Sequence, residues 1–287
     1  PMEGGVRSIG CNLTYDPLTV AQFQARLQKC LDADSAHEPD GWLEATNWFQ
    51  QALQPSGTVA HKSMLDALKT RRPIIVRDAF GHTVLANSRA LAAARISRAS
   101  EDPPGGRINR DAAGEPNGLL EDSAHAVFNT LIPPRTAKEY EAAARAALAE
   151  MAAQGLTTVL DADTPEHAMR AFQAVHKAGG LTLRMHFAPE MEIADTKDPA
   201  AAIRRVVALR TKYDGGPIGV KPGLTLRNAK FYIDGVISGP AFTGAMLEPY
   251  LVNAGTADAP RWVPGTSRGP EPYYAVEPLA DLIDRKS

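Results

Sequence analysis

A lysine, a tyrosine and an aspartate alternate along one short segment and offer the clearest chemistry in the sequence. The run Lys230-Phe231-Tyr232-Ile233-Asp234 is typical of a strand, and its period of two puts Lys230, Tyr232 and Asp234 on one face. Burying the charged amine of a lysine costs free energy unless the amine is paired or neutralised. We favour an ion pair with Asp234 or with a carboxylate of a neighbouring strand. The alternative is that the amine adds carbon dioxide and becomes a carbamate able to bridge two divalent metals.

Three further polar residues lie where a loop meets a regular element. His82 follows a predicted strand over residues 73–79 and precedes Asn87-Ser88, which is typical of a helix start. Loops that follow parallel strands carry the chemistry of many α/β enzymes, although an exposed loop histidine is an equally good interpretation. Glu121 is expected where a loop leads into a helix, and there the helix dipole alone would favour a carboxylate.

Helix and strand signals alternate between residues 136 and 234. Predicted helices begin at Thr136, Thr164 and Pro199, and another begins earlier at Thr19. Strands are predicted between and after the later helices, over residues 157–162, 181–188 and 227–234. This order indicates parallel strands joined by right-handed crossovers, in an open sheet or in a barrel. Asp161 and Asp163 would then lie at the carboxyl end of the first of these strands.

Two segments rich in glycine and proline interrupt the alternation. Residues 102–118 predict a turn-rich excursion with a small hairpin around Asp111–Gly114. Residues 249–274 predict a long loop or small subdomain of the kind that often covers a site. We expect the loop over residues 236–274 to set the choice of substrate.

Composition excludes several classes of function. The chain has 287 residues, 31 Lys+Arg against 33 Asp+Glu and 44% hydrophobic residues, which is typical of a globular protein. Without a basic run or a long apolar stretch, we expect neither nucleic acid nor membrane as a partner. The sequence has no Walker A loop, no GxGxxG after a strand and no GxSxG elbow. Cys11 and Cys30 form no disulfide framework, so we expect two thiols in a reducing cytoplasm, although a signal peptide before Pro1 would change this.

Four blocks of sequence, each unspecific alone, are specific in combination. They comprise Asp78 to Leu91 with Gly81-His82 and Asn87-Ser88, Pro104-Gly105-Gly106 through Glu121, Gly155 to Asp161, and Lys230 to Gly235. In order and spacing they resemble the amidohydrolase superfamily, in amidohydrolase family 3, the branch similar to N-substituted formamide deformylases. The resemblance extends from about Thr19 to Tyr250.

The resemblance implies an α/β fold, the (β/α)8 TIM-like barrel of metal-dependent hydrolases. Here the barrel is expected to be only partial, with a large insertion after the first strand position. Residues 1–135 would hold the insertion and an early barrel segment, and residues 136–248 the βα units that include Lys230. Residues 249–287 would form a loop or small subdomain that leads to the rest of the barrel.

The resemblance also implies a chemistry. In that family a divalent metal, usually zinc, activates water to attack an amide-like carbonyl. Lys230 is the metal ligand that matches here, and His82 and Asp234 are the matching catalytic residues. His82, Asn87 and Glu121 would contact a small-molecule substrate: an amide, a formamide or a cyclic amide. The family's other ligands fall before Pro1 or after Ser287, so we expect a central portion of the enzyme, inactive alone, with an absent or incomplete metal site.

Two other functions remain open at this point. The chain could be a non-catalytic homologue that serves as a binding or assembly module, or a metal-free enzyme that uses Lys230 as a Schiff-base amine. A partial barrel would also expose strand edges. We expect a second copy in a homo-oligomer, a swapped segment or further chain to cover them.

Overall fold

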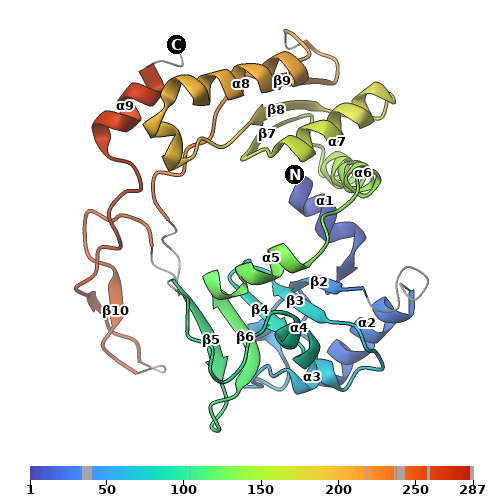
Figure 1. The fold of residues 1–287 in the computed structure, drawn as a ribbon, viewed down its shortest axis with the longest axis vertical. Helices are drawn as coiled ribbons and strands as arrows, with labels where there is room; N and C mark the ends of the chain where they lie inside the picture. Colours follow the sequence, from blue (N-terminus) through green and yellow to red (C-terminus); the bar gives the residue numbers. More distant parts are fainter. Residues whose placement is uncertain are drawn as a thin grey trace. The chain divides into compact units, whose positions relative to one another are not determined.

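The computed structural model describes residues 1–33, 41–103, 105–217, 219–235, 237, 243–256 and 259–284. Pro104 of the second motif block and part of the predicted substrate loop, residues 236, 238–242 and 257–258, lie outside the described residues. The chain divides into two compact units, Pro1–Glu150 and Met151–Ser287, and each is described by itself (Figure 1). The division falls inside helix α6 (Ala137–Ala153).

The first unit is built around a sheet with the strand order β1-β2-β3-β4-β6-β5. The strands β1, β2 and β3 are parallel, whereas β4, β6 and β5 pair as antiparallel neighbours. Their bounds are β1 (Cys11–Asn12), β2 (Leu43–Trp48), β3 (Ile74–Asp78), β4 (Thr83–Ala86), β5 (Gly106–Arg110) and β6 (Pro116–Asp122). The predicted strand over 73–79 and the hairpin at Asp111–Gly114 are therefore confirmed.

One feature of this sheet differs from the prediction. The strand β3 does not lead through a loop into a helix but turns back at once into the antiparallel strand β4. Gly81 has a φ of 80°, in the left-handed region that glycine reaches without a steric penalty. The carboxylate of Asp78 accepts the Thr83 N–H at 3.0 Å and closes the turn.

Helices of the first unit begin where the sequence places their caps. Thr19 and Gln22 bond reciprocally before α2, and Thr136 and Glu139 do the same before α6. These reciprocal bonds satisfy N–H groups that a helix start leaves without partners. The bounds are α1 (Met2–Ile9), α2 (Val20–Ala33), η1 (Gln50–Ala52), α3 (Ser63–Asp66), α4 (Ser88–Ala93), η2 (Ser123–Val127) and α5 (Phe128–Leu131).

Both faces of this sheet are buried. Ile74 and Val76 of β3 pack in one cluster with Phe23 of α2, while Ile75 packs in a second cluster with Phe128 of α5. A strand that is covered on both sides needs a continuous apolar run rather than an alternating one. The run of β-branched residues in β3 meets that need.

The second unit contains the parallel sheet β7-β8-β9, with α7 (Glu166–Lys177) and α8 (Pro199–Tyr213) as the connections. The strands are β7 (Thr158–Ala162), β8 (Arg184–Ala188) and β9 (Gly223–Leu226). The predicted helix–strand order is confirmed, but the third predicted strand, over 227–234, is wrong because β9 ends before it. Leu224 and Leu226 are buried opposite Met185 and Phe187, whereas Tyr232 and Ile233 remain exposed.

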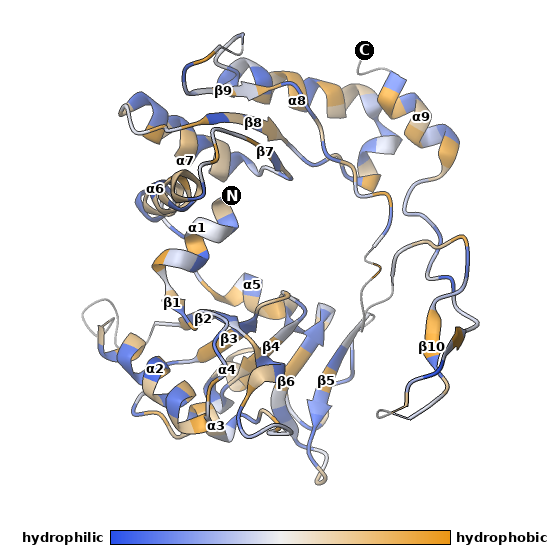
Figure 2. Ribbon diagram, turned by 180° about the vertical axis from the view of Figure 1, so that it is seen from behind, coloured by the Kyte–Doolittle hydropathy of each residue, from blue (hydrophilic) through white to orange (hydrophobic). Residues whose placement is uncertain are grey.

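The remaining elements of the second unit complete its packing. Leu282 of α9 (Val276–Asp284) is buried against Met191 and Ala202, and α9 alternates hydrophobic and hydrophilic residues along its length (Figure 2). The segment 249–274 contains a short antiparallel hairpin, β10 (Leu251–Asn253) and β11 (Trp262–Pro264), and η3 (Ile193–Lys197) precedes α8. Among the described residues, no helix combines the length and apolar character that crossing a membrane requires.

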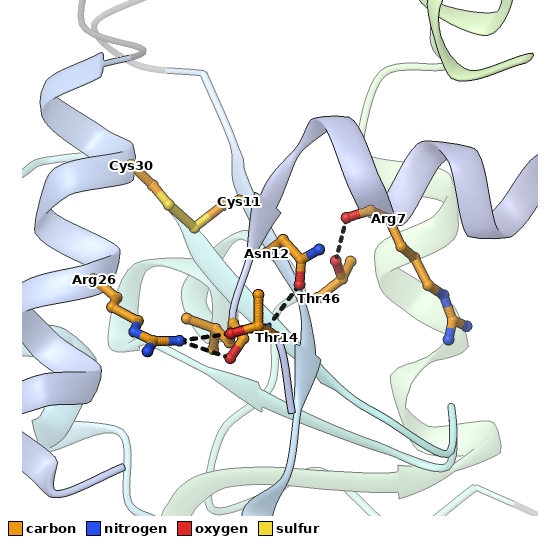
Figure 3. Close-up of a disulfide and its surroundings, with 8 residues drawn as sticks. Arg7, Cys11, Asn12, Thr14, Arg26, Cys30 and Thr46 are labelled. Atoms are coloured by element: carbon orange, nitrogen blue, oxygen red, sulfur yellow. Dashed lines mark hydrogen bonds between the residues drawn. A yellow bond between two sulfur atoms is a disulfide. The ribbon is translucent and has the colours of Figure 1, made fainter. Parts of the chain in front are cut away.

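The two cysteines form a disulfide, so the expectation of two free thiols is wrong. Cys11 at the start of β1 is bonded to Cys30 in α2 (Figure 3). Beside this bond, Arg26 of α2 donates hydrogen bonds to the Thr14 hydroxyl at 2.8 Å and to the Asp16 carboxylate at 2.6 Å, so that the disulfide and these bonds tie α2 to the segment around β1. Disulfides persist mainly in oxidising compartments. A cytoplasmic location stays a prediction, and this bond does not favour it.

Candidate functional site

The segments that follow β7, β8 and β9 bring several polar residues of the second unit together. The segment that follows β9 runs beside the segment that follows β8, with an isolated parallel bridge between Glu190 and Lys230. The Lys230 N–H donates to the Pro189 carbonyl at 2.9 Å, and the Met191 N–H donates to the Lys230 carbonyl at 2.8 Å. This edge of an α/β sheet is where such proteins usually bind ligands.

Asp163 occupies an unusual conformation directly after β7. Its φ is 76°, in a region that side-chain-bearing residues rarely adopt and that is enriched at functional sites. Its N–H and that of Thr164 both donate to the Ala188 carbonyl, at 3.0 and 2.9 Å. Its carboxylate accepts a hydrogen bond from the Tyr232 hydroxyl at 3.1 Å. Asp163 thus links the end of β7 both to β8 and to the segment after β9.

Lys230 lies against an aromatic ring and not in an ion pair. Its Nζ atom is 4.4 Å from the centroid of the Tyr232 ring, a cation–π geometry. In the described part of the chain no carboxylate lies within ion-pairing distance of this amine, so the expected ion pair is wrong. The carboxylate of Asp234 instead accepts the Ala245 N–H at 2.9 Å. The reason is that residues 230–234 do not form the strand whose alternation would have aligned the two side chains.

Negative charge is concentrated beside Lys230. Burial raises the pKa of Glu190, and the carboxylates of Asp163 and Glu192 raise it further. Arg205 opposes this only in part, because its guanidinium also bonds to Asp195 at 2.6 Å. Burial likewise raises the pKa of Tyr274, and nearby carboxylates, that of Glu190 first, add to the effect.

A pocket of about 480 Å³ opens among these groups. Three tyrosines and two glutamates contribute to its walls, together with two apolar residues of the turn before α8: Tyr232, Tyr273, Tyr274, Glu190, Glu192, Ile193 and Ala194. We call it the tyrosine pocket. Another pocket, of about 390 Å³, includes Arg184 and Gly223 and lies at the opposite, amino ends of β8 and β9.

His82 and Glu121 lie at the same end of the sheet of the first unit. His82 lies in the β3–β4 turn, and its Nδ1 is 2.9 Å from an oxygen of Asp122. Glu121 lies within β6 and pairs with Thr83, so its predicted place at the start of a helix is wrong. Its carboxylate is 2.6 Å from the guanidinium of Arg107. This carboxylate is therefore ion-paired within its own sheet.

Asn87 lies at the other end of β4 from His82, ~17 Å along the strand at about 3.4 Å per residue. It caps α4 and is 3% exposed. Its Oδ1 accepts the N–H groups of Ile74 at 3.0 Å and Ala90 at 2.8 Å, and its Nδ2 donates to the Arg72 carbonyl at 3.0 Å. These bonds give Asn87 a structural role, and its contact with substrate stays a prediction, like that of His82 and Glu121.

The comparison with known proteins decides the family. Residues 10–286 match the sequence profile of the Amidohydrolase family, which covers nearly the whole chain. The chain belongs to the Amidohydrolase family. The suspected resemblance is thereby confirmed, and the four motif blocks lie within the matched region.

Individual members of the Amidohydrolase family are more distant. YtcJ of Bacillus subtilis (strain 168), whose name assigns it provisionally to the amidohydrolases, is 29% identical over 188 residues, 64% of this chain and 35% of YtcJ. N-substituted formamide deformylase of Arthrobacter pascens is 26% identical over 55% of this chain and 30% of that enzyme. The chain thus spans about a third of the length of these two relatives.

Solved structures support the mixed α/β fold. The crystal structure of an uncharacterized metal-dependent hydrolase from Pyrococcus horikoshii OT3 aligns with a TM-score of 0.63 and 16% identity. The alignment covers 99% of this chain and 48% of that one. At this identity the likeness concerns the fold alone.

A metal site would need more ligands than the described residues supply. Among them, no group of three or more His, Cys, Asp or Glu side chains is arranged to hold a metal ion. Tight sites for zinc use three or four ligands, and Lys230 alone does not fit that requirement. We therefore assign these residues no step that passes through a metal.

The sequence did not single out Glu190 or Tyr274. Glu190 follows the predicted strand 181–188 by two residues, and that position was the available signal. Tyr274 lies in a proline-rich segment far along the chain, and its place in the pocket depends on tertiary contacts, such as the hydrogen bond from its hydroxyl to the Met191 carbonyl at 2.5 Å.

Proposed function

We propose that this chain is part of a metal-dependent amidohydrolase with a (β/α)8 barrel, which cleaves a C–N bond of an amide, formamide or cyclic amide. Water adds to the carbonyl carbon, and the tetrahedral intermediate then releases the amine with a proton. Membership of the Amidohydrolase family supports the reaction class. The observation that carries the proposal is the convergence of Asp163, Glu190, Lys230 and Tyr232 at the carboxyl ends of three parallel strands.

The proposed roles come from the family motifs and, for Tyr232 and Asp163, from position in the structure. Lys230 would be a ligand of a divalent metal, with zinc as our choice, and the further ligands would come from outside the described residues. Asp234 and His82 would act in catalysis, and His82, Asn87 and Glu121 would contact the substrate. Tyr232 and Asp163 would hold the segment that carries Lys230, because their hydrogen bond joins it to the end of β7.

The first experiment measures the metal bound by this chain. We expect elemental analysis to find well under one zinc per chain and amine release from a panel of formamides, acetamides and hydantoins to be negligible. Tight stoichiometric zinc would overturn the proposal that the chain alone lacks a complete site.

The second experiment uses the natural protein that carries this chain. Lys230→Arg keeps a cation for the Tyr232 ring but cannot form a carbamate, so we expect loss of metal and about a hundredfold or greater loss of amide hydrolysis. Hydrolysis that persists in Lys230→Arg would contradict the metal-ligand role. If the natural protein hydrolyses no amide, that result would favour a non-catalytic binding module. If borohydride traps a carbonyl compound on Lys230, that result would favour a Schiff-base enzyme.

A further inference from the structure

The walls of the tyrosine pocket combine aromatic rings with carboxylates. Tyr232 and Tyr273 are 41% and 42% exposed, so both rings remain accessible, whereas Tyr274 is buried and fixed by its bond to Met191. The Tyr274 ring also contacts Phe231 edge-on, with centroids 6.1 Å apart. The pocket therefore has one rigid wall and two accessible rings, which suits a small ligand with an apolar or cationic body.

The charge around the pocket is unbalanced. The charged groups that act most strongly on Glu190 are three carboxylates, those of Asp163, Glu192 and Asp195, against the single guanidinium of Arg205. Arg205 is already bonded to Asp195. Within the described residues, the Glu190 carboxylate itself has no ion-pair or hydrogen-bond partner. Glu190 is exposed, so an incoming cation can reach this carboxylate.

One ring of the pocket already carries a cation. Lys230 Nζ lies 4.4 Å from the Tyr232 centroid, although Lys230 does not line the pocket. An ammonium group is therefore compatible with this ring and with the carboxylates around it. The negative face of an aromatic ring attracts ammonium groups, and most strongly where water is partly excluded.

We propose that the tyrosine pocket binds a small organic cation and so selects amide substrates that carry an ammonium group. The pocket adjoins the Glu190–Lys230 bridge, so a substrate anchored there by its cation presents its amide bond beside Lys230. The substrate preference rests on the proposed hydrolytic function, whereas cation binding does not.

Isothermal titration calorimetry on this chain tests the binding directly. The probes are benzyltrimethylammonium chloride, neutral benzyl alcohol and anionic benzenesulfonate, each at low salt concentration. We expect the cation to bind about tenfold or more tightly than the alcohol, and the sulfonate to bind least. Equal binding of the cation and the alcohol would overturn the proposal.

Variants separate the contribution of the rings from that of the charge. Tyr273→Leu removes a ring and is expected to weaken binding of the cation about three- to tenfold, whereas Tyr273→Phe keeps the ring and should stay within about twofold. Glu190→Gln should weaken it about tenfold, with Glu101→Gln in the first unit as the matched control without effect. If Glu190→Gln leaves affinity unchanged while circular dichroism shows a native fold, the pocket does not recognise charge.

Activity of the natural protein distinguishes the two proposals. If it hydrolyses neutral and cationic amides equally well, the proposed preference for cationic substrates is wrong, while the proposed reaction is supported. If this chain binds the cation but the natural protein hydrolyses no amide, the proposed cation site is supported, while the proposed reaction is wrong.

Discussion

The two units use their carboxylates in opposite ways. In the first unit, burial raises the pKa of Glu44, but the guanidiniums of Arg77 and Arg135 lie 2.5 and 2.7 Å away and lower it overall. In the second unit, burial and neighbouring carboxylates raise the pKa of Glu190, and no described cation pairs with it. Glu44 is arranged to stabilise its fold, while Glu190 is left available for a ligand.

The same contrast extends to other polar groups. Asn87 in the first unit bonds both to the backbone of β3 and to that of α4. Asp163 in the second unit holds a left-handed conformation beside Tyr232, a residue of the tyrosine pocket. A polar residue whose bonds are all internal contributes to stability, whereas a strained or unpaired one at a strand end indicates a binding site. The following substitutions test this division by their effect on the free energy of unfolding.

The largest expected effect is that of Asn87→Ala. It removes the partners of three backbone groups around β3 and α4, and we expect a loss of about 3–5 kcal/mol in the first unit. Fluorescence of Trp42 and Trp48 during denaturant unfolding would report it. Asn129→Ala at an exposed position is the control and should cost less than about 1 kcal/mol. Unchanged stability in Asn87→Ala would support a role in binding substrate instead.

Next is the disulfide between Cys11 and Cys30, which lie 19 residues apart in sequence. Cross-linking a loop of this size restricts the unfolded chain and contributes about 3 kcal/mol. Reduction of the natural chain with dithiothreitol should therefore destabilise the first unit by about that amount. The variant Cys30→Ser should match the reduced chain and should no longer respond to dithiothreitol.

A smaller effect is expected for Glu44→Gln, about 1–3 kcal/mol at pH 7. The folded state lowers the pKa of Glu44 below its ordinary 4.5, so its stabilisation is complete above that value and is lost as pH falls through the folded pKa. The difference between the natural chain and the variant should shrink in acid. Glu121→Gln, which breaks the more exposed pair with Arg107, is the control and should cost under about 1 kcal/mol. A loss independent of pH would point to packing rather than charge.

The smallest effect, and of opposite sign, is expected for Glu190→Gln. Because the folded state raises the pKa of Glu190, its carboxylate opposes folding at neutral pH, and this cost disappears as pH falls below the ordinary 4.5. The variant should therefore be slightly more stable at pH 7, seen as slower hydrogen exchange in β8. Asp195→Asn, which breaks the pair with Arg205, should be less stable. Destabilisation by Glu190→Gln would contradict the proposed difference between Glu44, which stabilises its unit, and Glu190, which does not.

Local signals in the sequence were sufficient for much of the fold. The boxes at Thr19 and Thr136 begin α2 and α6, because a capping box is complete within four residues. The strand β9 was not predictable in the same way. Residues 223–226 and 227–234 both include segments with strand character, and burial against Met185 and Phe187 selects the first.

The candidate site was predictable only in part, for the same reason. Lys230 and Asp234 were singled out because polar and apolar residues alternate over residues 230–234. The strand that this alternation predicts does not form. The Tyr232–Asp163 bond joins residues 69 positions apart, and the wall formed by Tyr274 depends on a contact 83 positions away. Spacing along the chain carries no information on such contacts.

The sequence by itself determined the family, the alternation of helices and strands after residue 136 and the starts of the helices. Each of these depends on short-range spacing and on residue types that the chain displays directly. Tertiary structure alone decided the Cys11–Cys30 bond, the left-handed Asp163 and the pairing of Lys230 with a tyrosine ring. Those outcomes depend on which distant segments are buried together, since burial sets both the partner and the charge of a polar group.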